Sequence, residues 1–396
     1  MSSTTILAEP RTTQPAGRTA ADWAGTTWIV FVLLFSSTCI IVGLLWDISW
    51  HISIGRDTLW SPPHVLEQIG AACAGLACGW LALRTTFAGT SEARAHAGRF
   101  WGFRAPLGAW VAIWGALAMI FSVPFDDWWH NAYGLDVEIL SPPHIVLLSG
   151  MIAIQMGAIL LALGHQNRAG DERTRTFAIA YAFASGAMIA MVATTLSEYI
   201  LQPNIWRIGL TYQIVAAAFP LFLVAAARAG RLRFTATAAA AAFMLIFAGT
   251  QWILVQFPAT PRLTPIMRPV TNMVAFGFPM LLIVPAVAID LVHRRRREGS
   301  NEWVTASALG FAFVASLLAA QWPFTRFLVS SPLARNDFFL AERFPYWTEP
   351  GNWQAEFWSP QPPMTLAVAL LIAIVLATVS ARAGLWWGRW LRTVRR

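Results

Sequence analysis

The sequence predicts an all-α, multi-pass membrane protein with about ten membrane-spanning helices. Of its 396 residues, 57% are hydrophobic and only 12% are charged, whereas a soluble domain of this size carries about a quarter charged residues. Apolar runs recur along the chain, each long enough to cross a bilayer as a helix of about 20 residues. The basic residues fall between these runs, so we interpret them as signals of topology and expect no nucleic-acid partner.

Ten apolar runs account for the predicted helices. Three prolines, Pro220, Pro279 and Pro285, lie inside such runs, which membrane helices tolerate where neighbouring groups satisfy the freed backbone atoms. The first run follows a polar stretch and is long enough to stay in the bilayer, so we expect no cleaved signal peptide. The predicted spans are residues 27–50, 62–83, 105–125, 143–164, 176–201, 206–228, 234–256, 270–292, 303–322 and 363–387.

All 28 basic residues are arginines, and they divide unequally between the two sides of the predicted membrane. An even number of helices puts both termini on one side, and that side receives 21 of the 28 arginines. Arginine and lysine concentrate in cytoplasmic loops. We therefore predict a bacterial-type inner-membrane protein with both termini in the cytoplasm.

This topology divides the chain into five regions. Residues 1–26 form a cytoplasmic N-terminal tail, and residues 27–164 hold the first four helices. Residues 165–322 contain five further helices. Residues 323–362 form a long outer loop rich in Trp, Phe and Pro, which we interpret as a cap at the outer interface, the level that tryptophan prefers. Residues 363–396 hold the last helix and an arginine-rich cytoplasmic tail.

Two stretches within the first four helices repeat one pattern. WDISWHISIGRDTLWSPPH at 46–64 matches FDDWWHNAYGLDVEILSPPH at 125–144, with one extra residue before the second Ser-Pro-Pro-His. Helices one and two therefore match helices three and four, which predicts a duplicated helical hairpin. The aligned pairs are Asp47 with Asp126, His51 with His130, Gly55 with Gly134, Asp57 with Asp136, Ser61 with Ser141, His64 with His144 and Gly70 with Gly150.

The spacing within each copy predicts where its polar side chains lie. Asp47 and His51 are four residues apart and so share one face of a helix. Ser-Pro-Pro-His is typical of a helix start, with serine as the N-cap and proline in the first turn. His64 therefore lies in the first turn of the returning helix. We expect the three side chains of each copy to lie within about 6 Å of one another, close enough to share a metal ion.

An aspartate with two histidines is a metal-ligand set. Imidazole and carboxylate together suit copper, zinc, iron or manganese, and all four outer-side histidines belong to the two motifs. The ligands build two separate sites, or one dinuclear centre if the hairpins pack face to face. Alternatively, the Asp–His pairs hold no metal and act as a structural clamp or a proton relay. The predicted ligands are Asp47, His51, His64, Asp126, His130 and His144.

Four further acidic residues are candidates for supporting these ligands. Asp57 and Asp136 either cap their turns or orient a ligating histidine by a hydrogen bond. Glu67 follows His64 by one turn of the same helix. Glu198 lies four residues before Gln202 at the end of the fifth helix. It completes the site, marks a degenerate third hairpin, or is simply paired at a helix end.

The first motif resembles that of a known copper-enzyme family. Its spacing of Asp47, three residues, His51, twelve residues and His64 is similar to the metal-binding motif in the C subunit of the particulate methane and ammonia monooxygenases. The second copy, ending at His144, has thirteen residues in the longer gap. The resemblance covers about twenty residues per copy and implies copper ahead of zinc or iron, with ligands from neighbouring membrane helices. This chain has more helices than that subunit, and its motif is doubled.

The favoured function is therefore that of a copper-dependent membrane oxidoreductase or monooxygenase component, with an apolar substrate entering from the lipid. Such a component requires partner oxygenase or oxidase subunits. The alternative is a protein that handles copper or zinc, in transport or in oxidase assembly with a copper chaperone. Transport predicts further ligands deep in the membrane, where the sequence offers only methionines and Glu198.

Overall fold

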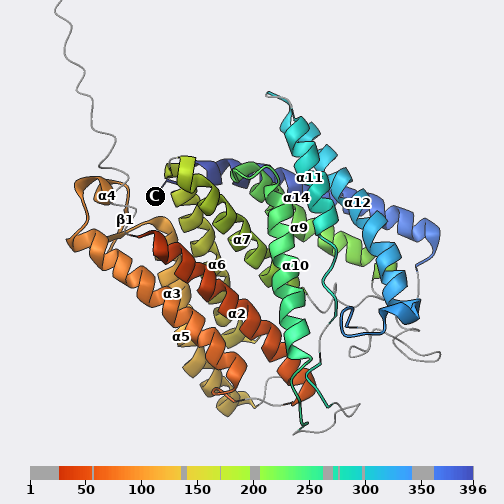
Figure 1. Cartoon of the computed structure of the whole chain (residues 1–396), viewed down its shortest axis with the longest axis horizontal. Helices are drawn as coiled ribbons and strands as arrows, with labels where there is room; N and C mark the ends of the chain where they lie inside the picture. The colour runs from red at the N-terminus through yellow and green to blue at the C-terminus, as the bar shows by residue number, and fades with distance from the viewer. Residues whose placement is uncertain are drawn as a thin grey trace, which may run out of the picture.

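Long apolar helices make up the fold of the computed structural model (Figure 1). Nine of the described helices are long and apolar enough to cross a membrane, so the chain is a multi-pass membrane protein. The helices are α2 (Thr27–Ser53), α3 (Pro62–Phe87), α4 (Ser91–Ala95), α5 (Leu107–Tyr133), α6 (Pro142–Arg168), α7 (Asp171–Thr195), α9 (Gly209–Ala229), α10 (Thr235–Leu254), α11 (Ile283–Arg295), α12 (Glu302–Ser330) and α14 (Pro363–Thr393). The structure describes residues 26–55, 58–134, 141–169, 171–196, 206–261, 271–274, 277–296, 299–340 and 361–395.

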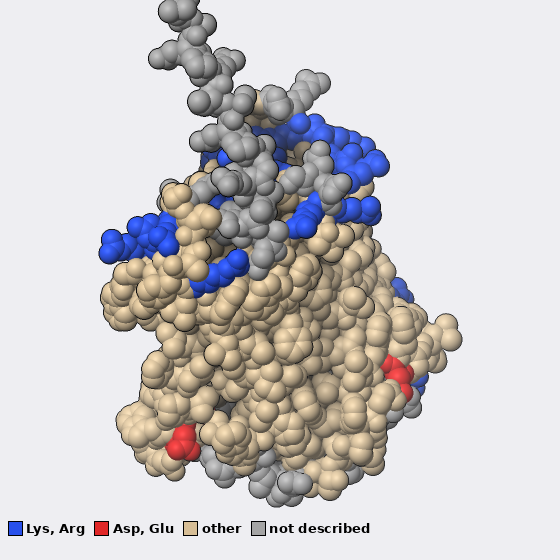
Figure 2. Space-filling model, turned by 60° about the vertical axis from the view of Figure 1, so that its left-hand side comes forward, with Lys and Arg blue, Asp and Glu red and all other residues tan. Residues whose placement is uncertain are grey.

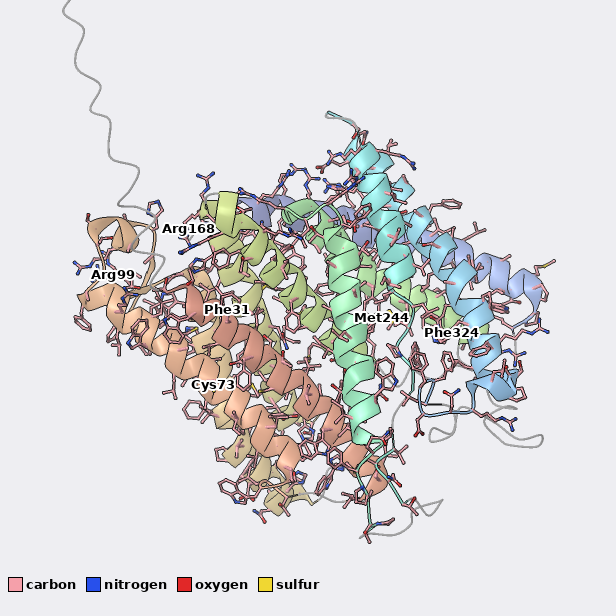
Figure 3. The ribbon with its side chains drawn as sticks, in the orientation of Figure 1. Phe31, Cys73, Arg99, Arg168, Met244 and Phe324 are labelled. Atoms are coloured by element: carbon pink, nitrogen blue, oxygen red, sulfur yellow. The ribbon has the colours of Figure 1, made fainter. Side chains whose placement is uncertain are left out.

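Arginine side chains gather at one end of the bundle (Figure 2). Figure 3 places Arg99 and Arg168 near this end, which we call the arginine-rich end. Both repeated motifs lie at the opposite helix ends, which we call the motif end. The arginine-rich end and the two motifs thus lie at opposite ends of the bundle.

The eighth predicted span, residues 270–292, is wrong as a continuous helix. Helix α11 begins only at Ile283, and the described residues from 277 to 282 are not helical. Gly277 has a φ of +109°, and Pro279 follows two residues later. Proline cannot donate a backbone hydrogen bond and its ring clashes with the preceding turn, so the two residues together stop a helix here. Pro285 is tolerated because it lies in the first turn of α11.

Buried side chains of two neighbouring helices satisfy the backbone of this non-helical stretch. Gln251 of α10 donates from Nε2 to the carbonyl oxygen of Gly277 at 2.9 Å. The amide of Leu281 donates to Oε1 of Gln321 of α12, also at 2.9 Å. Both glutamines are buried. Irregular backbone at membrane depth is tolerated only where protein groups cover it in this way, so the two glutamines supply the hydrogen bonds that a helix would otherwise make.

The predicted outer loop, residues 323–362, begins later than expected. Helix α12 continues through Pro323 and ends at Ser330, where Ser331-Pro332 starts a short 3-10 helix, η2 (Pro332–Ala334). The ring of Phe278, in the non-helical stretch, lies 5.3 Å from that of Phe324 in α12. The described part of the predicted loop therefore covers the chain around Phe278, while residues 341–360 lie outside the described residues.

A small hairpin that the sequence reasoning did not predict lies between α4 and α5. Strands β1 (Gly98–Phe100) and β2 (Phe103–Ala105) pair antiparallel. Trp101 and Gly102 form the two-residue turn, both with positive φ, as tight hairpin turns require. Its short strands give little alternation of polar and apolar residues, which is why the pattern was missed.

The two duplicated hairpins, α2–α3 and α5–α6, cross their helices at corresponding points. In the first, a Cβ added to Gly70 would lie 2.9 Å from the carbonyl oxygen of Ser36. In the second, a Cβ added to Gly150 would lie 2.7 Å from the carbonyl oxygen of Gly115. Gly70 and Gly150 are an aligned pair of the repeat, so the duplication preserves one close helix crossing. This contact limits how far the two helices of each hairpin can separate at the end that carries the motif.

Replacing Gly150 with alanine is expected to destabilise the protein by about 1–3 kcal/mol, because the added Cβ overlaps the backbone of α5. Thermal unfolding in detergent measures the effect. Gly79→Ala is the matched control, since nothing lies within 4 Å of a Cβ added there and alanine favours helix. Equal unfolding temperatures for the two variants would show that the crossing is not tight.

Candidate metal centres

Each motif brings one aspartate together with its own two histidines. Asp47 Oδ2 lies 3.6 Å from Nε2 of His51, and Asp47 Oδ1 lies 3.3 Å from Nε2 of His64. In the other hairpin the corresponding distances, from Asp126 to His130 and to His144, are 3.4 and 3.5 Å. All six predicted ligands therefore lie in two Asp–His–His triads, in which every Asp–His distance is 3.6 Å or less.

Backbone carbonyls fix the orientation of one ring in each triad. Nδ1 of His64 lies 3.0 Å from the carbonyl oxygen of Thr58, and Nδ1 of His130 lies 3.3 Å from that of Gly134. A carbonyl oxygen only accepts hydrogen bonds, so Nδ1 must carry the proton in both rings. A neutral ring then presents the lone pair of Nε2 to the carboxylate.

In this tautomer two hydrogen-bond acceptors, the ring Nε2 and a carboxylate oxygen, face each other. The Nε2 lone pair of His64 faces Asp47 Oδ1, a buried atom that makes no hydrogen bond to any described residue. Asp126 Oδ1 in the second triad is also buried and makes no hydrogen bond to a described residue, but it faces Nε2 of His144, whereas the ring oriented by a carbonyl, His130, faces Oδ2. A buried carboxylate oxygen without a partner is costly. A positive charge between ring and carboxylate resolves both problems, and that charge is either a metal ion or a proton.

The donor separations fit a small metal ion. Two donors bound to one tetrahedral ion at about 2.1 Å lie roughly 3.4 Å apart, and the four Asp–His separations fall between 3.3 and 3.6 Å. The rings nevertheless reach different oxygens of their carboxylate. Among the described residues, no three His, Cys, Asp or Glu side chains already surround one point. Metal binding therefore requires the rings to turn toward a common centre.

Local sequence explains how each triad is positioned. Helices α3 and α6 begin at their Ser-Pro-Pro-His sequences, which places the second histidine in the first turn. Ser141 Oγ accepts a hydrogen bond from the amide of His144, whereas Ser61 makes no such cap. Gly55 and Gly134, with φ of +103° and +89°, turn the chain at the helix ends.

The first triad is anchored on one further side. Ser49 Oγ donates to the carbonyl oxygen of Val274 at 2.7 Å, and the amide of Val274 donates to Ser53 Oγ at 2.7 Å. The two serines alternate with Asp47 and His51 along α2, so they hold the helix end from a different face. The sequence gives no sign of this contact because 225 residues separate Ser49 from Val274.

The two triads differ in their surroundings. Glu67 is buried one turn after His64, and its Cγ occupies the space that a side chain at Gly43 would need. The corresponding position of the second hairpin is Leu147. The Asp47 side chain is 17% exposed, against 31% for Asp126. The His51 side chain is nevertheless 51% exposed, against 30% for His130, so the first triad differs from the second mainly in the buried carboxyl group of Glu67 nearby.

The other predicted supporting residues have different outcomes. Asp57, Asp136 and Glu198 lie outside the described residues. Asp127 accepts from the amide group of Asn131, while its neighbour Asp126 contacts the histidines.

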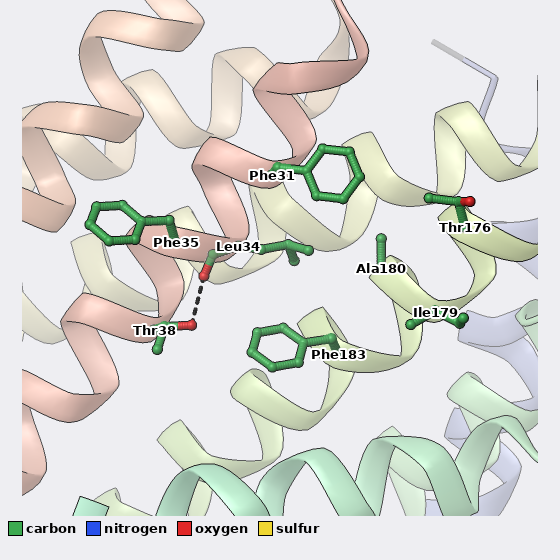
Figure 4. Close-up of a pocket in the computed structure, with 8 residues that line it drawn as sticks. All are labelled: Phe31, Leu34, Phe35, Thr38, Thr176, Ile179, Ala180 and Phe183. Atoms are coloured by element: carbon green, nitrogen blue, oxygen red, sulfur yellow. Dashed lines mark hydrogen bonds between the residues drawn. The ribbon is translucent and has the colours of Figure 1, made fainter. Parts of the chain in front are cut away.

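An apolar groove of about 370 Å³ lies between α2 and α7, away from the triads (Figure 4). Its nearest α2 residue to the motif is Thr38, nine residues or about 13 Å along the helix from Asp47. The hydroxyl of Thr38 donates to the carbonyl oxygen of Leu34. The groove therefore offers hydrocarbon contacts and is not part of either triad. It is lined by Phe31, Leu34, Phe35, Thr38, Thr176, Ile179, Ala180 and Phe183.

Comparison with known proteins gives no match for this chain. The chain matches no protein-family model, no curated protein and no solved structure. What is established is a multi-pass α-helical membrane protein with a duplicated Asp–His–His motif.

Proposed function

We propose that the protein binds two metal ions, one in each Asp–His–His triad, and that the metal is copper. The observation that carries the proposal is the contact of His64 with Asp47. Nδ1 of this ring meets a carbonyl, and its Nε2 faces a buried carboxylate oxygen to which no described residue donates a hydrogen bond. Histidines that bind metals commonly donate their second nitrogen to a carbonyl in this way.

Copper and oxidation chemistry rest on the motif resemblance to the C subunit of the particulate monooxygenases. A copper ion bound in a triad would supply one-electron and oxygen chemistry. The chain itself contributes two imidazoles and a carboxylate per site, and the carboxylate of the first site, Asp47, is 17% exposed. We assign the protein as a membrane oxidoreductase or monooxygenase component of an inner membrane, with the triads on the outer face and partner subunits supplying electrons.

The competing function is a clamp or proton relay, and one observation favours it. Each aspartate contacts its two rings through separate oxygens, as a carboxylate bridging two imidazolium groups does. In that state the proton on Nε2 provides the positive charge. The hairpin ends are then tied by ion pairs, and no metal is needed.

Metal analysis with electron paramagnetic resonance separates the two functions. Protein purified without chelators and incubated with copper should retain about two copper ions per chain after dialysis. The copper(II) spectrum should show hyperfine splitting from two nitrogen ligands per ion. Protein that stays metal-free after incubation with copper, zinc and iron would falsify the metal proposal and leave the protonated clamp.

A further inference from the structure

Four arginines converge on one glutamate at the arginine-rich end, where α9, α12 and α14 meet. Oε1 of Glu302 lies 3.3 Å from Nη1 of Arg228 and 3.9 Å from Nη2 of Arg296. Oε2 lies 3.2 Å from Nη2 of Arg382, and Nη2 of Arg389 also contacts Oε1. Four positive charges share one carboxylate, which leaves an excess of three.

Part of this cluster is buried with unused hydrogen-bond donors. Arg228 is only 9% exposed, because Gly388 lets α14 approach so closely that a Cβ there would lie 2.8 Å from that of Arg228. Nε of Arg228 and Nε of Arg382 are buried and hydrogen-bond to no described residue. Buried charged donors without acceptors are costly. An anion bound at the cluster would offset its excess positive charge and accept hydrogen bonds from these donors.

Exposed tryptophans surround the arginines. The guanidinium of Arg382 lies 5.7 Å from the ring centre of Trp303. Trp303, Trp386 and Trp390 are 55%, 65% and 41% exposed. Tryptophan rings outside a membrane protein settle at the level of the lipid headgroups. The cluster is therefore at the depth where phosphate groups of lipids lie.

We propose that the arginine cluster, formed by Arg228, Arg296, Arg382 and Arg389 around Glu302, binds the phosphate group of an anionic phospholipid. Guanidinium groups bind phosphate oxygens through paired, charge-assisted hydrogen bonds, and basic pockets between membrane helices are typical headgroup sites. Free phosphate offers the same oxygens. The surrounding tryptophans favour the lipid, whose acyl chains would lie along α14.

Native mass spectrometry of the full-length protein in detergent, titrated with phosphatidylglycerol, tests the proposal. Wild-type protein is expected to bind phosphatidylglycerol at least five-fold more tightly than phosphatidylcholine. Replacing Arg382 and Arg389 with glutamine should weaken phosphatidylglycerol binding about five-fold per arginine. Glu302→Gln should strengthen it by a similar factor, because the competing carboxylate charge is lost. A purely structural role of Glu302 would not produce that gain.

The control pair is Arg231→Gln with Arg233→Gln, which removes two charges from the same end but outside the cluster. Unfolding temperatures verify that all variants are folded. Equal weakening by the control pair, or weaker binding by Glu302→Gln, would overturn the site. A separate titration with inorganic phosphate addresses the source: binding as tight as that of phosphatidylglycerol, with the same dependence on the variants, would overturn the lipid assignment.

Discussion

His64→Ala protein is expected to hold about half the metal of the wild type, His144→Ala protein the same, and the double variant almost none. Each substitution removes one of two imidazoles from one triad, and two protein ligands retain a metal ion poorly. Metal content per chain after dialysis measures the effect. The structure predicts this additive pattern because each aspartate contacts both histidines of its own hairpin.

His96→Ala is the control for nonspecific loss, since His96 lies in the connection between α4 and β1 at the arginine-rich end. Its metal content should equal that of the wild type. A single variant that loses all metal would instead indicate one dinuclear centre shared by the hairpins. If the triads are clamps, wild type and variants are all metal-free, and the histidine variants differ only in unfolding temperature.

The sequence was sufficient to predict the membrane class and the triads because both depend on local patterns. Apolar runs of bilayer length predicted nine of the described helices, with shifted boundaries. Four-residue spacing put Asp47 and His51 on one helix face, and Ser-Pro-Pro-His put His64 at the start of the next helix. Because the connection between the two helices is short, the three side chains are brought close together at the hairpin end.

The features that were missed depend on contacts between distant parts of the chain. The close approach of Arg228 and Gly388, which are 160 residues apart in the chain, sets the charge environment of Glu302. Hydropathy gave residues 270–292 the same weight as a true span, although Gly277 and Pro279 prevent a helix there. Apolar composition alone shows that a segment is buried, and backbone hydrogen bonding decides whether it is helical.

Gln251→Leu is expected to destabilise the protein by about 2–3 kcal/mol, because it leaves the buried carbonyl of Gly277 without its donor in a place that water does not reach. Gln321→Leu should act similarly through the amide of Leu281. Thermal unfolding in detergent measures the loss. Hydrogen–deuterium exchange should rise in peptides covering 277–295 and stay unchanged in α5 and α6.

Gln256→Leu provides the matched control, since this glutamine is exposed, lies in the turn after α10 and, among the described residues, donates to the nearby carbonyl of Trp252. In a continuous helix over 270–292 no carbonyl would depend on Gln251. A neutral or stabilising effect of Gln251→Leu would therefore contradict a non-helical backbone at residues 277–282. Destabilisation confined to the variants of the two buried glutamines would support the non-helical backbone. Only such a backbone needs side chains from α10 and α12 to complete its hydrogen bonds.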